Sequence, residues 1–175
     1  MGVLHGTRHP PPNPPAGHRM TAAIALGSNL PSPYGPPEAN LREALTRIAT
    51  LGHITAVSTF HATDPFGYLD QPRFLNAAAL LETQLPPIDL LHQLLAIEHA
   101  MGRDRVHTPP KGPRIIDLDL LLYADQVLQT TDLTLPHPSL HERRFVLAPL
   151  AEIAPYLQHP TLHRTIADLL THLPQ

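Results

Sequence analysis

The chain has 175 residues, 42% of them hydrophobic and 15% charged, which is typical of one globular domain with a buried core and excludes a disordered chain. Its formal net charge of -3, with histidine neutral, argues against a broad nucleic-acid surface, so no nucleic-acid partner is expected. The chain contains no cysteine, which excludes disulfides and thiolate metal sites and fits a reducing compartment.

Proline and histidine dominate the start of the chain, whose centre is the run His-Pro-Pro-Pro-Asn-Pro-Pro beginning at His9. Such a run forms neither a helix nor a sheet ladder, so residues 1–20 are predicted to be a disordered Pro/His-rich extension and residues 21–175 a single domain. No apolar run reaches the roughly 20 residues of a membrane helix, and no apolar signal segment follows Met1. A cytoplasmic protein without a membrane partner is therefore expected.

From residue 21 the pattern predicts a strand, a helix, two strands separated by a loop, a second helix and a fourth strand. The strands are expected at about residues 22–26, 54–60, 74–82 and 115–123, and the helices at about 36–52 and 86–102. A short return strand at 126–129 would follow a hairpin turn, and helical stretches are expected near 142–151 and 165–170. This order predicts an α+β fold, a ferredoxin-like βαββαβ sandwich with an added C-terminal hairpin and short helices. Nothing in it demands more than a monomer.

Two carboxylates interrupt the apolar fourth strand at Asp117 and Asp119. Because side chains alternate along a strand, both should leave the same face, roughly 6–7 Å apart. Carboxylates in so apolar a run are costly to desolvate unless a partner such as a hard cation pairs them, and two Mg²⁺ ions about 4 Å apart could be bridged from this spacing. The alternative is a strand edge whose aspartates face water.

Four cations crowd the loop before the carboxylate pair, at Arg103, Arg105, Lys111 and Arg114. Cations beside anions on a loop fit a polyphosphate bridged by Mg²⁺. In the other interpretation the arginines neutralise the aspartates directly.

Three further residues carry weaker signals. Glu98 falls at the edge of the apolar stripe of the second helix, and the pattern alone favours a surface acid over a buried acceptor. His137 is held in an extended loop by the prolines on both sides of it, where it could contact a phosphate or a base or simply form a turn. Arg143 and Arg144 begin a helical segment, and such an arginine pair is commonly exposed to solvent.

Six blocks of sequence lie in order between about residues 22 and 155. They are Ala25-Leu26-Gly27-Ser28-Asn29-Leu30; Asp70-Gln71-Pro72 with Phe74-Leu75-Asn76-Ala77; Ile97-Glu98 with Gly102-Arg103-x-Arg105; Gly112-Pro113-Arg114-Ile115-Ile116-Asp117-Leu118-Asp119; Leu135-Pro136-His137-Pro138; and Arg143-x-Phe145-Val146-Leu147 with Pro149-Leu150. Together they resemble the 6-hydroxymethyl-7,8-dihydropterin pyrophosphokinase family of folate biosynthesis. The Pro-Arg-x-x-Asp-x-Asp block combined with Leu-Pro-His-Pro is the most specific part of this resemblance.

The resemblance implies a ferredoxin-like fold and transfer of the β,γ-diphosphate of ATP to the hydroxymethyl oxygen of the pterin, with release of AMP. It implies that Asp117 and Asp119 hold two Mg²⁺ ions and that Arg103 and Arg114 are catalytic and stabilise the transferring phosphates. Around ATP it places Glu98, Arg105, Leu120, Thr134, His137 and Arg143. Around the pterin it places Gly27, Thr63, Asp64, Phe66, Phe74, Asn76 and Phe145, with the pterin between the two rings Phe74 and Phe145.

The chain departs from the family pattern in the loop before Arg114. The loop is one residue longer, and Lys111 stands where the family often has a tryptophan that could cover the pterin. Leu95 and Asp132 also replace a glutamine and an arginine that approach the nucleotide in the family. These changes bear on affinity and loop closure more than on reaction type.

Two other classes of protein are compatible with this fold. An RNA-binding module would need exposed aromatic residues and a basic face, whereas only 5% of the residues are aromatic and the net charge is negative. A nucleotide-binding remnant without catalysis would not be expected to retain both aspartates together with Arg103, Arg105 and Arg114.

Overall fold

The computed structural model describes residues 17–65, 67–104, 106, 108 and 111–174 of the chain. Residues 1–16 lie outside this description, so the predicted extension stays a prediction. The elements, in chain order, are β1(Met20–Ser28), α1(Pro37–Ile48), η1(Ala49–Leu51), β2(His53–Val57), β3(His61–Thr63), β4(Phe74–Thr83), α2(Pro87–Ala100), β5(Asp117–Tyr123), β6(Leu128–Gln129), β7(Thr134–Leu135), η2(Leu140–Glu142), α3(Arg144–Ile153) and α4(Ile166–Thr171). Over the described residues no helix is long and apolar enough to cross a membrane.

The main sheet has the strand order β2-β4-β1-β5, and β3 also pairs with β4. All of these pairs are antiparallel. With α1 after β1 and α2 after β4, this is the order expected for a ferredoxin-like βαββαβ sandwich, so the predicted α+β fold is confirmed. The two central strands, β1 and β4, are rich in alanine, whose short side chains let helices pack closely on both faces of the sheet.

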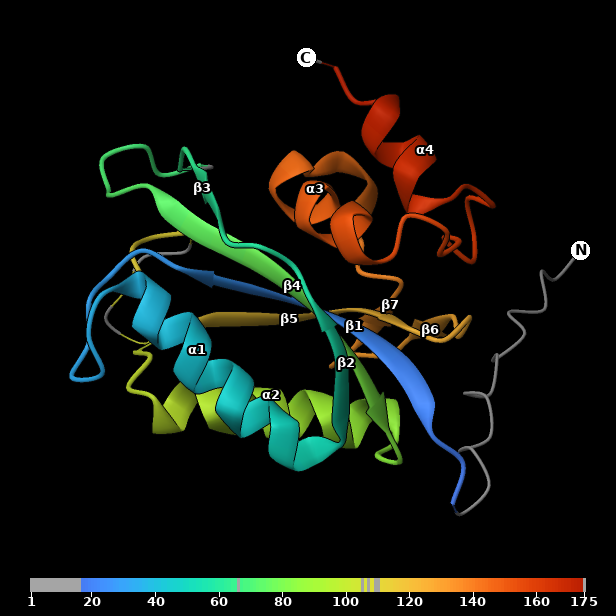
Figure 1. Ribbon diagram of the computed structural model, residues 1–175, viewed down its shortest axis with the longest axis horizontal. Helices are drawn as coiled ribbons and strands as arrows, with labels where there is room; N and C mark the ends of the chain where they lie inside the picture. Colours follow the sequence, from blue (N-terminus) through green and yellow to red (C-terminus); the bar gives the residue numbers. More distant parts are fainter. Residues whose placement is uncertain (1–16, 66, 105, 107, 109–110, 175) are drawn as a thin grey trace, which may run out of the picture.

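Helices cover both faces of the sheet (Figure 1), and each face has its own core. The core on the α1 and α2 side includes Ile24, Leu41, Leu94 and Leu120. The core on the α3 and α4 side includes Leu121, with side chains of α3 and α4 packed against it. Proline at the start of α1 and α2 suits the first turn of a helix, where a missing N–H leaves no bond unmade.

The structure corrects the predicted path after β5. The chain turns at Ala124 as expected, but β6 pairs with β7 and does not return along β5. The free edge of β5 is used instead by the segment after β7, where the His137 N–H donates to the Leu121 carbonyl oxygen at 2.9 Å. The hairpin is therefore an addition beside the sheet.

Element boundaries also differ from the prediction. Strand β1 runs from Met20 to Ser28 rather than over residues 22–26, β2 ends at Val57 rather than at residue 60, and β5 begins at Asp117 rather than at residue 115. Strand β3, at His61–Thr63, was not expected, because its three residues carry no periodicity of their own and are extended only through pairing with β4.

Candidate functional site

A pocket opens on the face of the sheet where β4, β1 and β5 lie side by side. Its lining consists of Gly27, Thr63, Asp64, Phe74, Asn76, Lys111, Arg114, Asp117, Asp119, Arg143 and Phe145. It has an empty volume of about 530 Å³, part of it open to solvent, which is within the range of small-molecule sites. Three of its residues, Asn76, Gly27 and Asp117, lie opposite one another in a row across the three strands.

Gly27 forms the floor of the pocket. A Cβ atom at this position would lie 3.1 Å from Asn76 Oδ1 and 4.0 Å from Asp117 Cβ. Because Gly27 does not adopt a positive φ, its value here is the space that it leaves rather than an unusual backbone conformation. A flat ligand can therefore approach the sheet between an amide and a carboxylate.

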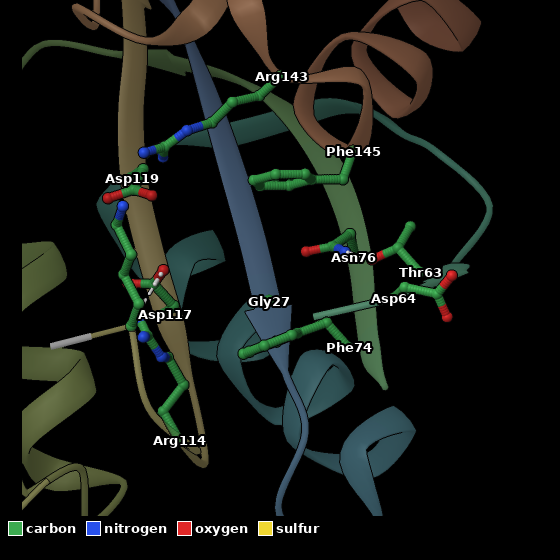
Figure 2. A pocket seen from close by; sticks show the side chains of 11 residues that line it. Gly27, Thr63, Asp64, Phe74, Asn76, Arg114, Asp117, Asp119, Arg143 and Phe145 are labelled. Carbon is green, nitrogen blue, oxygen red and sulfur yellow. Dashed lines mark hydrogen bonds and ion pairs between the residues drawn. The ribbon is translucent and has the colours of Figure 1, made fainter. Parts of the chain in front are cut away.

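Two aromatic rings flank this floor. Figure 2 shows Phe74, from the start of β4, and Phe145, from α3, on opposite sides of the pocket with Asn76 between them. An arginine guanidinium lies over each ring, with Arg114 Cζ 5.7 Å from the Phe74 centroid and Arg143 Cζ 5.7 Å from the Phe145 centroid. Facing rings suit a flat heteroaromatic ligand, and the cation–π contacts order the guanidinium groups beside it.

The polar edge of this aromatic cleft is fixed by a hydrogen bond. Asn76 Nδ2 donates to Thr63 Oγ1 at 2.5 Å, which leaves the carbonyl oxygen of the amide directed towards Gly27. Asp64 lies beside them and is exposed, accepting from Arg73 Nε at 3.1 Å. Asn76 is therefore held ready to accept from a donor on a ligand.

The other half of the pocket is a cluster of charges centred on Asp117. Arg103 Nη1 donates to Asp117 Oδ1 and to Glu98 Oε2, both at 2.7 Å, and Arg114 Nη1 donates to Asp117 Oδ2 at 3.3 Å. Glu98 Oε2 also accepts from the Leu118 N–H at 2.7 Å. Burial lowers the pKa of Arg103, but its attraction to Asp117 and Glu98 outweighs this and raises the pKa overall.

Asp119 lies on the same face of β5 as Asp117, as strand alternation predicted. Burial, followed by repulsion from Asp117 and Glu98, raises the pKa of Asp119 to about 7, although Arg143 and Arg103 partly offset this. Figure 2 shows the Arg143 guanidinium directed towards Asp119. A buried carboxyl beside a second one gains most from a bound cation, because the cation removes the repulsion that raises its pKa.

The donor set in this cluster fits Mg²⁺ rather than a metal that requires a complete protein cage. Among the described residues there is no group of three or more His, Cys, Asp or Glu side chains that could hold a metal ion. Two carboxylates leave room for phosphate and water oxygens, which is the usual arrangement around Mg²⁺.

His137 borders a neighbouring hollow near the β6–β7 pair. Its Nδ1 accepts from the Ser139 N–H at 3.1 Å, so in the neutral ring Nε2 carries the proton. Burial, followed by the charge of Arg143, lowers the pKa of His137, whereas Asp117 opposes this. A neutral ring with one N–H is available as a hydrogen-bond donor.

Ten of the seventeen predicted site residues line the main pocket, and Lys111 joins them. Of the others, Glu98 and Arg103 line a hollow beside α2 with Leu95, while Thr134 and His137 line the hollow near β6 and β7. Leu120, in β5, points into the buried core on the α1 and α2 side of the sheet. Phe66 and Arg105 lie outside the described residues.

The sequence pattern alone was wrong about Glu98 and missed two residues. Glu98 is 1% exposed, not a surface acid, because the edge of the α2 stripe packs against β5. Asn29 and Gln71 hold the segments beside the pocket through side-chain amides. Both lie in the resembling blocks, which was the only signal that could have found them.

This fold, with an arginine–carboxylate cluster beside an aromatic cleft, defines the class of a phosphoryl-transfer enzyme with a flat acceptor. The model of the 7,8-dihydro-6-hydroxymethylpterin-pyrophosphokinase (HPPK) family matches residues 23–155. The chain belongs to this family of pyrophosphokinases, the enzymes of a step in folate biosynthesis.

Relatives of known name support this placement. The chain is 44% identical over 151 residues to the 2-amino-4-hydroxy-6-hydroxymethyldihydropteridine pyrophosphokinase of Pseudomonas aeruginosa, covering 86% of this chain and 90% of that protein. It is 43% identical over 141 residues to the protein of the same name from Haemophilus influenzae, covering 81% of this chain and 86% of that protein.

Longer proteins contain a similar domain. The chain is 41% identical over 155 residues to the Folic acid synthesis protein fol1 of Schizosaccharomyces pombe, covering 87% of this chain but only 20% of that protein. The crystal structure of wild-type Plasmodium falciparum HPPK-DHPS superposes with a TM-score of 0.67 at 15% identity, covering 87% of this chain and 44% of that chain. At 15% sequence identity this superposition shows that the two proteins share a fold, and it carries no argument about function.

Proposed function

We propose that this pocket transfers the diphosphate of Mg·ATP to 6-hydroxymethyl-7,8-dihydropterin and releases AMP. The hydroxymethyl oxygen forms a bond to the β-phosphorus and loses its proton, while the bond from that phosphorus to the oxygen shared with the α-phosphate breaks. The observation that carries this proposal is the meeting, across β4, β1 and β5, of an aromatic cleft and a carboxylate–arginine cluster in one pocket.

The acceptor half of the pocket is the aromatic cleft. The pterin lies between Phe74 and Phe145 over the floor at Gly27, and the fixed amide of Asn76 accepts from its polar edge. Thr63 orients that amide, and Asp64 completes this side of the pocket. Phe66, which the resemblance also assigns to the pterin, lies outside the described residues. Stacking supplies most of the binding surface and the amide supplies the orientation.

The donor half is the charge cluster. Asp117 and Asp119 would hold two Mg²⁺ ions, which neutralise the triphosphate when bound. Arg103 and Arg114 are placed to bind the phosphates in transfer, and Glu98 keeps Arg103 in place.

The rest of the nucleotide extends away from this cluster. In the proposal Thr134, His137 and Arg143 lie around it, and the neutral Nε2–H of His137 donates to it. Arg105, which the resemblance also assigns to ATP, lies outside the described residues, and the side chain of Leu120 belongs to the buried core. Transfer of a phosphoryl group depends on such positioning and neutralisation rather than on a covalent intermediate with the protein.

The direct test is product identity. The protein is incubated with Mg·ATP and the reduced pterin alcohol, and the products are separated by anion exchange and by ³¹P NMR. We expect AMP and the pterin diphosphate in equal amounts. Formation of ADP, or AMP without pterin diphosphate, would rule out the proposed reaction.

The metal assignment is tested by Asp117→Ala and Asp119→Ala, with Asp125→Ala as the matched control. Asp125 is an exposed aspartate just beyond β5 and away from the pocket. Loss of about 3 kcal/mol of charge stabilisation predicts that each pocket variant loses about a hundredfold or more in kcat while the control does not. Near-normal kcat at ordinary Mg²⁺ in either pocket variant, with its fold intact by circular dichroism, contradicts the assignment.

A further inference from the structure

Two side-chain amides outside the pocket link the segments on either side of it. Asn29 follows β1 and is 2% exposed. Its Oδ1 accepts from the Arg114 N–H at 2.8 Å, and its own N–H donates to the Arg114 carbonyl oxygen at 3.1 Å. Asn29 therefore fixes both the N–H and the carbonyl group of Arg114.

The second amide continues from the first. Asn29 Nδ2 donates to Gln71 Oε1 at 3.0 Å and to the Pro72 carbonyl oxygen at 2.9 Å. Gln71 Nε2 in turn donates to the carbonyl oxygens of Lys111, at 2.9 Å, and Tyr68, at 2.5 Å. The segment before β4 is thus tied through two amides to the segment before β5.

The backbone at Lys111 needs such support. Its φ of 59° is in the left-handed region, which non-glycine residues adopt at a cost. A Cβ atom at Gly67, on the facing segment, would lie 2.7 Å from Lys111 Cδ, so the two segments are already in contact at this point. The hydrogen bond from Gln71 holds the Lys111 carbonyl oxygen in the conformation that permits this contact.

The group that receives this positioning faces the chemistry. Arg114 Nε donates to the Gly112 carbonyl oxygen at 3.0 Å, its Nη1 donates to Asp117, and its guanidinium lies over Phe74. It therefore touches the aromatic half and the charged half of the pocket at the same time. A shift of its backbone would move its guanidinium relative to both.

We propose that Asn29 and Gln71 are positioning residues for the phosphate transfer, which act by fixing Arg114 and by coupling the segment beside the acceptor to the segment beside the nucleotide. The kinetic part of this inference rests on the proposed function, whereas the positioning of Arg114 is a property of the protein without substrates. The two parts are tested separately.

The first experiment measures amide hydrogen exchange in the protein without ligands. Gln71→Leu removes the donors to residues 68 and 111 and the acceptor for Asn29, so the Arg114 amide should exchange about fivefold faster. Gln84→Leu, an exposed glutamine just after the far end of β4, is the matched control and should leave that amide unchanged. Unchanged exchange at Arg114 in a folded Gln71→Leu protein overturns the proposal whatever the reaction is.

A shorter amide provides a second variant. Gln71→Asn keeps the functional group but lacks the methylene needed to reach Asn29 and Lys111 together. It should also speed exchange at Arg114, and it serves where Gln71→Leu fails to fold. Exchange at the wild-type rate in this variant contradicts the bridging role.

The second experiment is kinetic. Gln71→Leu should lower kcat about tenfold, with KM for Mg·ATP within about twofold, because misplacement acts on the reacting geometry. In an Arg114→Ala background the same substitution should have almost no further effect, since the group that it positions is gone. An equal loss in both backgrounds would show that Gln71 does not act through Arg114. If the wild-type protein forms no pterin diphosphate, the proposed function fails while the exchange result still decides the positioning.

Discussion

Gly27→Ala adds a single methyl group to the floor of the pocket. The new Cβ would lie 3.1 Å from Asn76 Oδ1, which is closer than an ordinary van der Waals contact. Asn76 would have to move, yet its amide is held by the hydrogen bond from Nδ2 to Thr63 Oγ1. The substitution therefore displaces the group that is proposed to orient the pterin, without removing it.

The size of the effect follows from the hydrogen bond that is lost. Misaligning a buried acceptor from its ligand donor costs about 1–3 kcal/mol, which corresponds to about 5- to 150-fold weaker binding of the pterin. Isothermal titration of the pterin into the protein saturated with a non-hydrolysable ATP analogue measures this directly. Affinity for the analogue itself should stay within about twofold, because the charge cluster lies on the other side of Gly27.

An Asn76→Ala background identifies the route of the effect. Shortening Asn76 removes the atom that the methyl group would meet, so Gly27→Ala should then cost little further affinity. The reasoning is refuted if the methyl group weakens binding equally in both backgrounds, or if Gly27→Ala alone binds the pterin as tightly as the wild type.

The remaining predictions concern stability and are measured by urea unfolding. Gly52→Ala should destabilise by about 3 kcal/mol or fail to fold, because its Cβ would lie 2.1 Å from a carbonyl oxygen of β4; normal stability contradicts this. Glu98→Ala should cost about 3–5 kcal/mol, because it removes one of the two carboxylates that pair with the buried Arg103 and the acceptor of the Leu118 N–H; a loss below about 1 kcal/mol refutes this. Burial, followed by the charges of His141 and His163, lowers the pKa of His159 below 6.5. The contribution of a neutral His159 to the free energy of unfolding should therefore be fully present above pH 6.5 and be lost as the pH falls below that value. His159→Gln should make the free energy of unfolding depend less on pH in this range, and an unchanged slope argues against this.

Much of the fold could be predicted because its main elements carry their own signals. Strand β4 is ten residues with an almost continuous apolar stretch, and α1 and α2 each begin with proline and have an acidic residue in the first turn. Strands β3 and β7 could not be predicted in the same way. They contain three and two residues, and pairing with β4 and β6 decides their conformation.

The residues of the candidate site also fall into two groups, those whose placement follows from local geometry and those whose placement depends on tertiary contacts. Alternation in β5 was sufficient to put Asp117 and Asp119 on one face, since that depends only on local geometry. The burial of Glu98 depends on what packs against its helix, which periodicity does not specify. The bond between Asn29 and Gln71 joins residues 42 positions apart in segments without regular structure, so no local pattern encodes it.

The two interpretations of the arginines in the sequence are not exclusive. Arg103 and Arg114 neutralise Asp117 directly in this structure, as the simpler interpretation held. That pairing also orients three charged groups and removes them from most of the solvent. Their desolvation penalty is therefore part of the free energy of folding and does not reduce the free energy of ligand binding. A polyphosphate entering with Mg²⁺ would give both arginines and Asp117 a new partner of the same sign as the one that each leaves. The arginine–Asp117 ion pairs and the proposed phosphate contacts are therefore alternative partners of the same charged groups.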